Sequence, residues 1–489
     1  MTSSTAETPV LDAAITRRNN RVIALLIAAA FVVILNETIM SVALPELTRD
    51  LSITLATAQW LTTGFMLTMA VVIPITGFLL QRFSTRTIFI AAMSLFSTGT
   101  LIAGLAPGFE VLLAGRIVQA SGTAIMMPLL MTTLMTLVEP ARRGRMMGSV
   151  SIVISVAPAI GPTISGLILH YLSWRWMFWI VLPIALIMLI VGIRNVVNVT
   201  EPRVVPIDVL SVVLSALGFG GLIFGISRIG ETTAESNTLL IASLVIGAVA
   251  LIAFVLRQLV LQRQNRALLD LRTFLSPIFT ASVLMMVISM AALFGTIVLF
   301  PIFMTQALHL DTIQIGLFML PGGLLMGLMA PFVGRLYDAV GPRPLVIPGT
   351  VIVSAVLWFL STINTETTFG VLLAAHIVLS LGLALLFTPL FTASMASVAP
   401  PLYSHASAIV GTVQQVAGAA GTALFVTVMS LQSAQRAQAG AGMEEAVTSG
   451  VGSAFFIGAC LSVVAVIIGP FIAKPADAPG ADGKIHAAH

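Results

Sequence analysis

Long apolar runs alternate with short polar segments along the whole chain. Each run has roughly the 20 residues that an α-helix needs to cross the hydrocarbon core of a bilayer. The runs are continuous, whereas the strands of a membrane β-barrel alternate apolar and polar positions, so helices are the expected spanning elements. Fourteen spans are predicted, near residues 22–44, 58–80, 87–106, 110–137, 146–171, 175–196, 208–227, 238–256, 278–306, 313–335, 345–363, 369–397, 404–431 and 451–473.

The composition supports this interpretation. Of the 489 residues, 58% are hydrophobic and only 9% are charged, whereas soluble domains carry about 25% charged residues. We therefore expect an all-α polytopic membrane protein. The basic residues are scattered over short loops without a basic domain, which argues against nucleic-acid binding. Cys460 is the only cysteine, so an intramolecular disulfide and a cysteine-based zinc site are excluded, and no cofactor is expected.

The distribution of basic residues predicts the orientation. With the N-terminus inside, 18 Lys and Arg residues fall on the cytoplasmic side, four fall outside and Arg116 lies within a span, which accounts for all 23. Such an excess marks the cytoplasmic side of a membrane protein. Both termini are therefore expected in the cytoplasm of a multi-pass protein of the inner (plasma) membrane. The preference for Arg over Lys, together with the many alanines, is typical of a GC-rich bacterium.

The two halves of the chain repeat a loop pattern. The stretch GFLLQRFSTR at 77–86 recurs as GRLYDAVGPR at 334–343, displaced by 257 residues. Each copy falls at the cytoplasmic end of the second span of a six-span block. Two homologous blocks, with two further spans between them, account for fourteen. We expect an N-terminal tail, an N-terminal six-helix bundle, a linker with two helices, a C-terminal six-helix bundle and a C-terminal tail, at residues 1–21, 22–196, 197–272, 273–473 and 474–489.

Two residues of opposite charge are embedded within spans. At 1.5 Å per residue, Glu37 lies about 10 Å from the outer end of the first span, and Arg116 lies about 9 Å from the outer end of the fourth. The other acidic residues fall in loops, span ends or tails. An Arg in the middle of a span costs about 2.5–3.5 kcal/mol on insertion scales, so such residues face the protein interior and find a partner.

Four short motifs, found in the appropriate spans and in order, resemble those of the major facilitator superfamily, in particular its fourteen-span drug:proton antiporter branch. The best preserved motif is the loop pattern G-x-L-x-D-x-x-G-x-[RK]. In the second half it is matched by Gly334, Leu336, Asp338, Gly341 and Arg343. The resemblance covers nearly all of the chain except its tails.

The first copy of the loop pattern departs from the family. It keeps Gly77, Arg82 and Arg86, but Gln81 stands in place of the acid and Ser84 in place of the second glycine. The missing acid argues against a charge relay through this loop.

The other three motifs lie within spans. The first span ends in VALP at 42–45, and its acid is Glu37, one position after Asn36, where the family usually has Asp. The fifth span contains APAIGPTISG at 157–166, with small residues replacing two glycines. The motif of the fourth span is matched by Arg116, Gln119, Gly122 and Ala124.

The resemblance implies a role for the embedded charges. Glu37 would exchange a proton for a cationic or polar substrate, while Arg116 adjusts its proton affinity. The alternative is a buried ion pair or hydrogen-bond network that only orients two helices. Substrate contact is expected from Glu37 and, with helix–helix hydrogen bonds or packing as the alternative, from Asn36, Gln119, Gln414, Gln415 and Phe294. A packing role is favoured for the lone His376.

Further residues are expected to serve conformational change. Pro158, Gly161, Pro162 and Gly166 would let the fifth span bend and approach its neighbours, or would form a static kink. The loops at 77–86 and 334–343 are expected to close the cytoplasmic face through contacts that break when the two bundles rock.

The resemblance therefore implies a proton-coupled antiporter that exports lipophilic or amphiphilic drugs by alternating access. The alternative is a transporter or flippase of an endogenous lipid or metabolite. A membrane enzyme or sensor is disfavoured, because the sequence contains no catalytic triad, metal-ligand cluster or Walker motif. The expected partners are protons, small amphiphilic substrates and the bilayer. We expect a monomer, and no feature of the sequence implies an adaptor protein.

Overall fold

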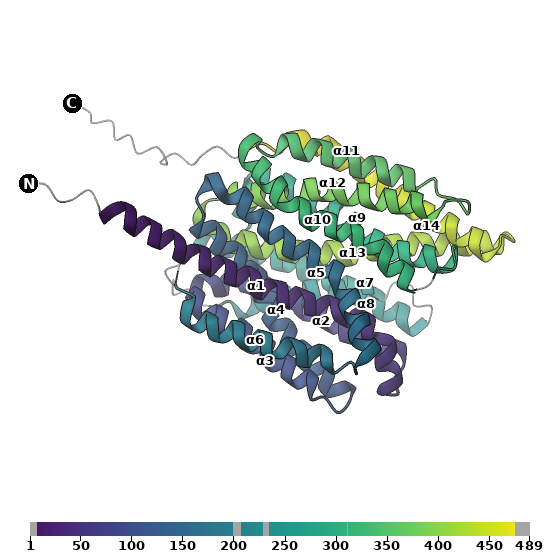
Figure 1. Cartoon of the computed structure of the whole chain (residues 1–489), viewed down its shortest axis with the longest axis horizontal. Coiled ribbons are helices and arrows are strands. Elements are labelled where there is room, and N and C mark those ends of the chain that lie inside the picture. The colour runs from purple at the N-terminus through teal and green to yellow at the C-terminus, as the bar shows by residue number, and fades with distance from the viewer. Residues whose placement is uncertain (1–6, 199–206, 228–233, 311, 475–489) are drawn as a thin grey trace, which may run out of the picture.

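The computed structural model describes residues 7–198, 207–227, 234–310 and 312–474 (Figure 1). The described residues form helices and turns without a strand. The long helices are α1 (Glu7–Asp50), α2 (Leu55–Arg82), α3 (Thr85–Gly104), α4 (Phe109–Leu137), α5 (Arg143–Tyr171), α6 (Trp176–Asn195), α7 (Val209–Ser227), α8 (Ala234–Leu261), α9 (Pro277–Gln306), α10 (Thr312–Val340), α11 (Arg343–Leu360), α12 (Phe369–Ala396), α13 (Tyr403–Gln438) and α14 (Met443–Ile468).

These helices confirm the predicted spans. Thirteen of them are long and apolar enough to cross a membrane by themselves, and α5 is the fourteenth if its two bent parts are taken as one span. Helix α1 begins at Glu7, so it also covers most of the predicted N-terminal tail. The two ends of the chain (1–6 and 475–489) and two parts of the linker (199–206 and 228–233) lie outside the described residues.

The helices form two bundles and a peripheral pair. Helices α1–α6 pack together as the N-terminal half, and α9–α14 pack together as the C-terminal half. The halves meet mainly where α5 lies against α10 and α2 against α13. Helix α7 packs on α2 and α13 beside this boundary, whereas α8 packs mainly on α7.

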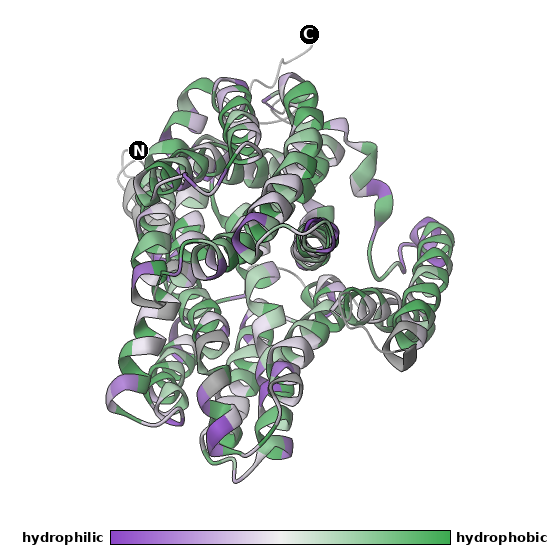
Figure 2. Ribbon diagram, turned by 90° about the vertical axis from the view of Figure 1, so that its right-hand side faces the viewer, coloured by the Kyte–Doolittle hydropathy of each residue, from purple (hydrophilic) through white to green (hydrophobic). Residues whose placement is uncertain are grey.

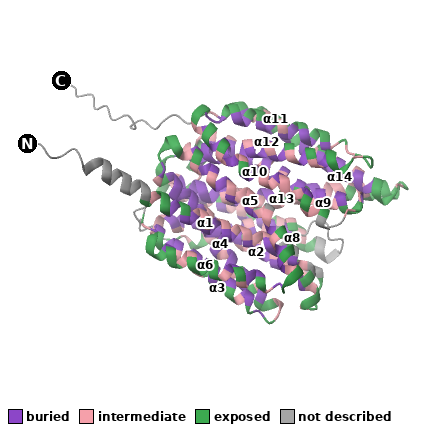
Figure 3. Cartoon of the chain, viewed as in Figure 1, coloured by how far each residue is buried: buried purple, intermediate pink, exposed green. Residues whose placement is uncertain are grey.

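Hydrophobic residues lie along the outer helices as well as the inner ones (Figure 2), and exposed residues occur along the helices as well as in the loops (Figure 3). On α8, for example, Val249 and Ile252 expose 62% and 61% of their surface. Exposed apolar area on this scale marks a surface that does not face water. The chain therefore presents a lipid-facing perimeter.

We call the end that carries residues 83–84, 138–142, 341–342 and 397–402 the motif face, because both loop motifs lie there. The other end, which carries residues 51–54, 105–108, 172–175 and 361–368, is the opposite face.

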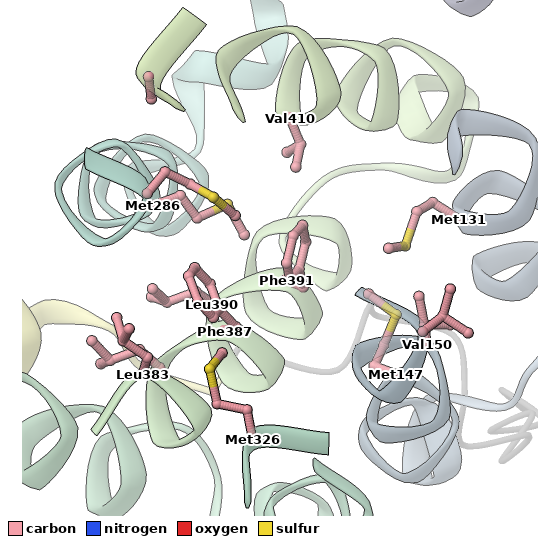
Figure 4. Packing of buried hydrophobic residues seen from close by; sticks show 14 of the residues in the cluster. Met131, Met147, Val150, Met286, Met326, Leu383, Phe387, Leu390, Phe391 and Val410 are labelled. Atoms are coloured by element: carbon pink, nitrogen blue, oxygen red, sulfur yellow. The ribbon is translucent and has the colours of Figure 1, made fainter. Parts of the chain in front are cut away.

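The two halves touch closely toward the motif face. Met131 and Met147 of the N-terminal half lie near Phe391 of the C-terminal half in one apolar cluster (Figure 4). Two hydroxyl pairs add to this contact: Thr132 Oγ1 lies 2.9 Å from Ser407 Oγ, and Thr388 Oγ1 donates to Ser151 Oγ at 2.8 Å.

Glycines along α5 and α10 differ in how closely they are packed. A Cβ atom added to Gly166 of α5 or to Gly316 of α10 would meet no atom within 4 Å. On the same two helices, Gly148 and Gly334 leave no such room, because each lies against the backbone of the other half. The molecule is therefore closed at the motif face.

Candidate functional site

Glu37 lies on α1 with its side chain partly exposed, although it is far from either end of the helix. Its neighbour Asn36 is only 2% exposed. Successive residues of a helix point about 100° apart, so the two side chains face different surroundings. Among the described residues, no hydrogen bond or ion pair involves the Glu37 carboxylate. Glu37 is thus an accessible acid in the interior of the N-terminal half.

Arg116, on α4, is the centre of a buried polar network. Its Nη1 donates to Asn36 Oδ1 at 3.2 Å and to Gln119 Oε1 at 2.7 Å. Gln119 Nε2 in turn donates to Thr100 Oγ1 at 2.7 Å. The Arg116 side chain is 1% exposed and its guanidinium lies 4.0 Å from the centroid of the Phe65 ring. The network joins α1, α3 and α4 through a cation that neutral groups hold in place.

Within the described residues, no carboxylate contacts the positive charge of Arg116 directly. Glu37 and Arg116 interact electrostatically without forming an ion pair within the described part of the chain. The Nε atom of Arg116 finds no acceptor there either. A buried network that orients helices therefore fits Arg116, Asn36 and Gln119. Glu37 is not part of that network.

Helix α5 bends next to Glu37. The segment Pro140–Pro158, which contains a short turn and the first part of α5, meets Thr163–Tyr171 at 41°. Gly161 lies at this bend, directly against the side chain of Thr38, where a Cβ atom would have no room. Thr38 follows Glu37 in the chain, so the glycine of the fifth-span motif fixes how closely α5 approaches the acid.

The remaining residues of this motif differ from one another. Pro158 is partly exposed and precedes the bend. Gly166 has open space around it. The side chain of Pro162 lies outside the described residues.

The polar residues predicted in the C-terminal half lie on α13, which packs against α2 and α4 of the other half. The hydroxyl of Ser407 forms a hydrogen bond with that of Thr132 on α4, and Gly411 lies against Ile73 of α2. Gln414 lies seven residues after Ser407, and Gln415 lies four residues after Gly411. At helical spacing each glutamine is therefore on the same side of α13 as that earlier residue. Both glutamines are partly exposed, one turn beyond the closed contact.

Phe294 of α9 is also partly exposed and packs against Gly418 of α13, with 3.1 Å between ring atoms and the position of a Cβ on that glycine. The structure thus places the polar and aromatic candidates of the C-terminal half on neighbouring helices. It shows no direct contact between them and Glu37.

The second loop motif makes a direct contact between the halves. The two carboxylate oxygens of Asp338 accept hydrogen bonds from the backbone N–H groups of Gly144 and Arg145, both at 2.8 Å. These groups belong to the first turn of α5, where a helix favours a negative charge. Gly334 lies against the Gly144 carbonyl, and Gly341 has a φ of +80°, which favours glycine.

The first loop motif makes a different contact. Gln81 Nε2 lies 2.7 Å from Nε2 of His405 on α13, and Gly77 packs against Ser404 and Ala408. Ser84, in place of the second glycine, accepts a hydrogen bond from Thr87 N and caps α3. The arginines of both motifs, Arg82, Arg86 and Arg343, lie at the surface or are partly exposed.

His376 is enclosed by aromatic rings, as a packing role requires. It stacks on Phe318 with 5.2 Å between ring centroids and meets Phe300 edge-on at 5.5 Å. The candidate that the sequence did not single out is His405. Its signal in the sequence is weak, because a lone His near the start of an apolar run has no local partner.

A cavity of about 670 Å³ lies at the opposite face between α13 and α14, lined by Arg436, Phe456 and other residues of the C-terminal half. Within the described residues, no group of three His, Cys, Asp or Glu side chains could hold a metal ion.

Known proteins resemble this chain over nearly its full length. The profile of the Major Facilitator Superfamily matches residues 26–422. Lincomycin resistance protein LmrB of Listeria monocytogenes is 42% identical over 93% of this chain and 96% of its own. LmrB of Bacillus subtilis is 40% identical over 92% and 94%. Multidrug export protein EmrB of Haemophilus influenzae is 28% identical over 81% and 78%.

The fold is shared with more distant transporters. The proton:xylose symporter XylE superposes with a TM-score of 0.66 at 14% identity, covering 94% of this chain and 96% of its own. The human organic anion transporter MFSD10 superposes with a TM-score of 0.65 at 12% identity, covering 92% and 99%. Together with the two six-helix halves and the matched profile, these likenesses show that the chain belongs to the Major Facilitator Superfamily.

Proposed function

We propose that this protein is a proton-coupled antiporter that exports lipophilic or amphiphilic drugs across the inner membrane. The observation that carries the proposal is Glu37, an accessible acid inside the N-terminal half, beside a buried cation that it does not neutralise by direct contact. The names of its relatives, which refer to lincomycin resistance and multidrug export, support the class of substrate.

The proposed orientation places the motif face in the cytoplasm, because most basic residues lie on that side. Reporters fused at Ser4 and Gly480 should then both read cytoplasmic, and a reporter at Ala441 should read external. Opposite sidedness of the two termini would contradict the fourteen-span topology. In this orientation the structure is closed toward the cytoplasm.

The proposed cycle uses this geometry. Facing outward, Glu37 takes up a proton, and loss of its negative charge releases a cationic or polar substrate. The halves then rock, and Glu37 releases the proton to the cytoplasm as the next substrate binds. Each proton that moves inward supplies about 2.3 kcal/mol per 100 mV of membrane potential, in addition to any pH gradient.

The substrate would contact both halves. On the N-terminal side we propose Glu37, Asn36 and Gln119. On the C-terminal side we propose Phe294, Gln414 and Gln415. Asn36 and Gln119 are buried and bonded to Arg116 in the outward-facing arrangement, so their contact with substrate requires Arg116 to move. An aromatic ring and flexible amides suit substrates of varied shape.

The direct test is transport into inverted membrane vesicles with and without a proton gradient, screened over cationic dyes, antibiotics and labelled lipids. Gradient-dependent accumulation of drugs supports the proposal. Movement of lipid alone, or accumulation that is indifferent to the gradient, would contradict it. The protein should act as a monomer in this assay.

A further inference from the structure

Helices α7 and α8 are joined by a charged clamp at the motif face. Arg257 of α8 donates to Asp208 through Nε and Nη2, both at 2.6 Å. Asp208 directly precedes α7 and also accepts hydrogen bonds from the N–H and the hydroxyl of Ser211. The hydrogen bonds from Arg257 hold the pKa of Asp208 well below its ordinary value. The pair of helices is therefore fixed as one unit at this end.

From this clamp, α8 reaches the segment that leads to α9. Gln258 is fully buried, and its Nε2 donates to Ser211 Oγ at 2.8 Å. Its Oε1 accepts from the backbone N–H groups of Leu268 and Leu269, at 2.7 and 3.3 Å. One side chain thus satisfies two backbone donors of a segment that has no regular helix. Without Gln258 these buried donors would lose their acceptor.

The same segment holds His405 of α13. The Nδ1 atom of His405 lies 3.2 Å from the carbonyl oxygen of Leu268. A carbonyl only accepts, so Nδ1 carries the hydrogen and Nε2 is left as an acceptor. Nε2 faces Gln81 Nε2 at 2.7 Å, and an amide nitrogen is a donor. In the series of contacts from Gln258 through Leu268 and His405 to Gln81, each hydrogen-bond donor therefore faces an acceptor.

This chain of contacts ends on the boundary between the halves. His405 is 4% exposed and lies beside Ser404 and Ala408, which pack against Gly77 of α2. A Cβ on Gly77 would approach the Ser404 carbonyl to 3.2 Å, so α2 and α13 are in close contact here. The charged groups beside His405 are Asp270 and Arg272, which pair with each other.

We propose that α7 and α8 hold the α2–α13 contact closed at the motif face, with Gln258 and His405 as positioning residues. Neither residue lies at the substrate contacts proposed above. The two helices between the halves would then bias the conformational equilibrium toward the state that is closed to the cytoplasm. The proposal rests on alternating access, but its test needs neither substrate nor a proton gradient.

The test measures the separation of the halves at the motif face. Spin labels would be attached to cysteines that replace Thr87 and Ala399, in a Cys460→Ser background. Both residues are exposed, one on either side of the contact. Gln258→Ala should raise the ratio of open to closed molecules about fivefold, equivalent to about 1 kcal/mol for one buried neutral hydrogen-bonding group. The matched control is Ser215→Ala, because Ser215 is also fully buried on α7 but bonds only to Val212 O of its own helix.

Two further variants separate transmission from simple support of the fold. Gln81→Ala removes the last hydrogen bond in this series of contacts, the one to His405. If the contacts act as one unit, Gln258→Ala and Gln81→Ala together should open the contact no more than the stronger single variant. His405→Asn, whose amide can still reach the Leu268 carbonyl but not Gln81, should resemble Gln81→Ala.

Transport gives a second readout. A larger cytoplasm-open fraction lowers the KM for substrate on that side, because the competent state is more populated. A folding defect would lower the maximal rate and leave KM unchanged. Additive effects of the two single variants, or distance distributions unchanged in Gln258→Ala, would overturn the proposal. Should Gln258→Ala fail to fold, Gln81→Ala carries the test at the other end of these contacts, and distance distributions unchanged in that variant would overturn the proposal.

Discussion

The two halves share one architecture but carry their acids at different places. The N-terminal half has Glu37 within a span, while its loop motif has the neutral Gln81. The C-terminal half has Asp338 in its loop motif, while its span residue His376 lies among phenylalanines. In the proposed mechanism the embedded acid handles the proton and the loop acid handles closure. The comparison teaches that two related halves need not duplicate a function, because each needs to supply only one.

The largest effect is expected from removing the embedded acid. Glu37→Gln keeps the shape but removes the charge change, so proton-driven export should fall more than about 100-fold, to the level of the gradient-free control. Binding of a neutral substrate should persist, and its pH dependence between about pH 5 and 8 should flatten. Transport and substrate-induced proton release by purified protein would measure this.

The matched control is Glu46→Gln, an exposed acid on the same helix, which should transport normally. His376→Gln tests the other half and should leave proton release intact. Continued proton release and uphill export by Glu37→Gln would place the coupling site elsewhere, with His376 the next residue to test.

The two loop motifs should differ in a graded way. Asp338→Asn weakens two charge-assisted hydrogen bonds, each worth about 1.5–3 kcal/mol, whereas Gln81→Ala removes a neutral one worth about 1 kcal/mol. Transport at equal expression should therefore fall about tenfold in Asp338→Asn and about twofold in Gln81→Ala. Wild-type rates in both variants would remove the loops from the mechanism.

Within α5, two glycines of one motif offer a sharper comparison. Gly161→Ala would force the bend away from Thr38, at a cost of about 1–3 kcal/mol for overpacking, and should slow transport severalfold. Gly166→Ala meets open space and should be neutral. Initial rates and thermal stability of both variants decide the point, and equal behaviour would separate the bend from the transport cycle.

The smallest effect is expected at the opposite face of the N-terminal half. A hydrogen bond from Trp174, together with Arg175, lowers the pKa of Asp50. A depressed pKa contributes stability above the ordinary Asp value of about 3.9, and this contribution is lost as the pH falls through the lower folded value. Because the Asp50 side chain is 47% exposed, Asp50→Asn should cost about 0.5 kcal/mol or less.

Melting temperatures of wild type and Asp50→Asn should therefore differ slightly at pH 7 and converge as the pH falls below the lowered pKa of Asp50. The corresponding pair of the C-terminal half, His309 and Glu444, is also exposed, and Glu444→Gln should be as mild. A large effect in either half would show that the opposite-face loops contribute more than surface pairs usually do.

Much of the fold follows from the sequence because lipid imposes simple rules. Continuous apolar runs located the spans, and the charged outliers Glu37 and Arg116 were found for the same reason. The boundary of α1 did not follow, since hydropathy marks where a helix meets lipid and is silent on the polar turns from Glu7 onward. Hydropathy also could not say which groups hold Arg116, because Asn36 and Glu37 are adjacent and only the rotation of α1 decides between them.

The contacts at the motif face were harder to foresee. Gln81 was recognised as a departure, yet its partner His405 lies 324 positions away. Gln258 binds backbone N–H groups, which occur in any sequence, so no side-chain pattern marks its partners. Local patterns reveal residues that break a rule of their own helix. They do not reveal residues whose partner is an irregular segment elsewhere in the chain.

The exposed surface of α8 has a consequence for the mechanics of the membrane. Only 17% of its most apolar stretch is buried in the protein, so the thickness and lateral pressure of the bilayer act directly on this helix. A helix whose apolar length does not match the bilayer tilts, and a tilt of α8 must be absorbed by the clamp at Asp208 and the hydrogen bonds of Gln258. The acyl chains around α8 thereby exert a force that reaches the contact between α2 and α13.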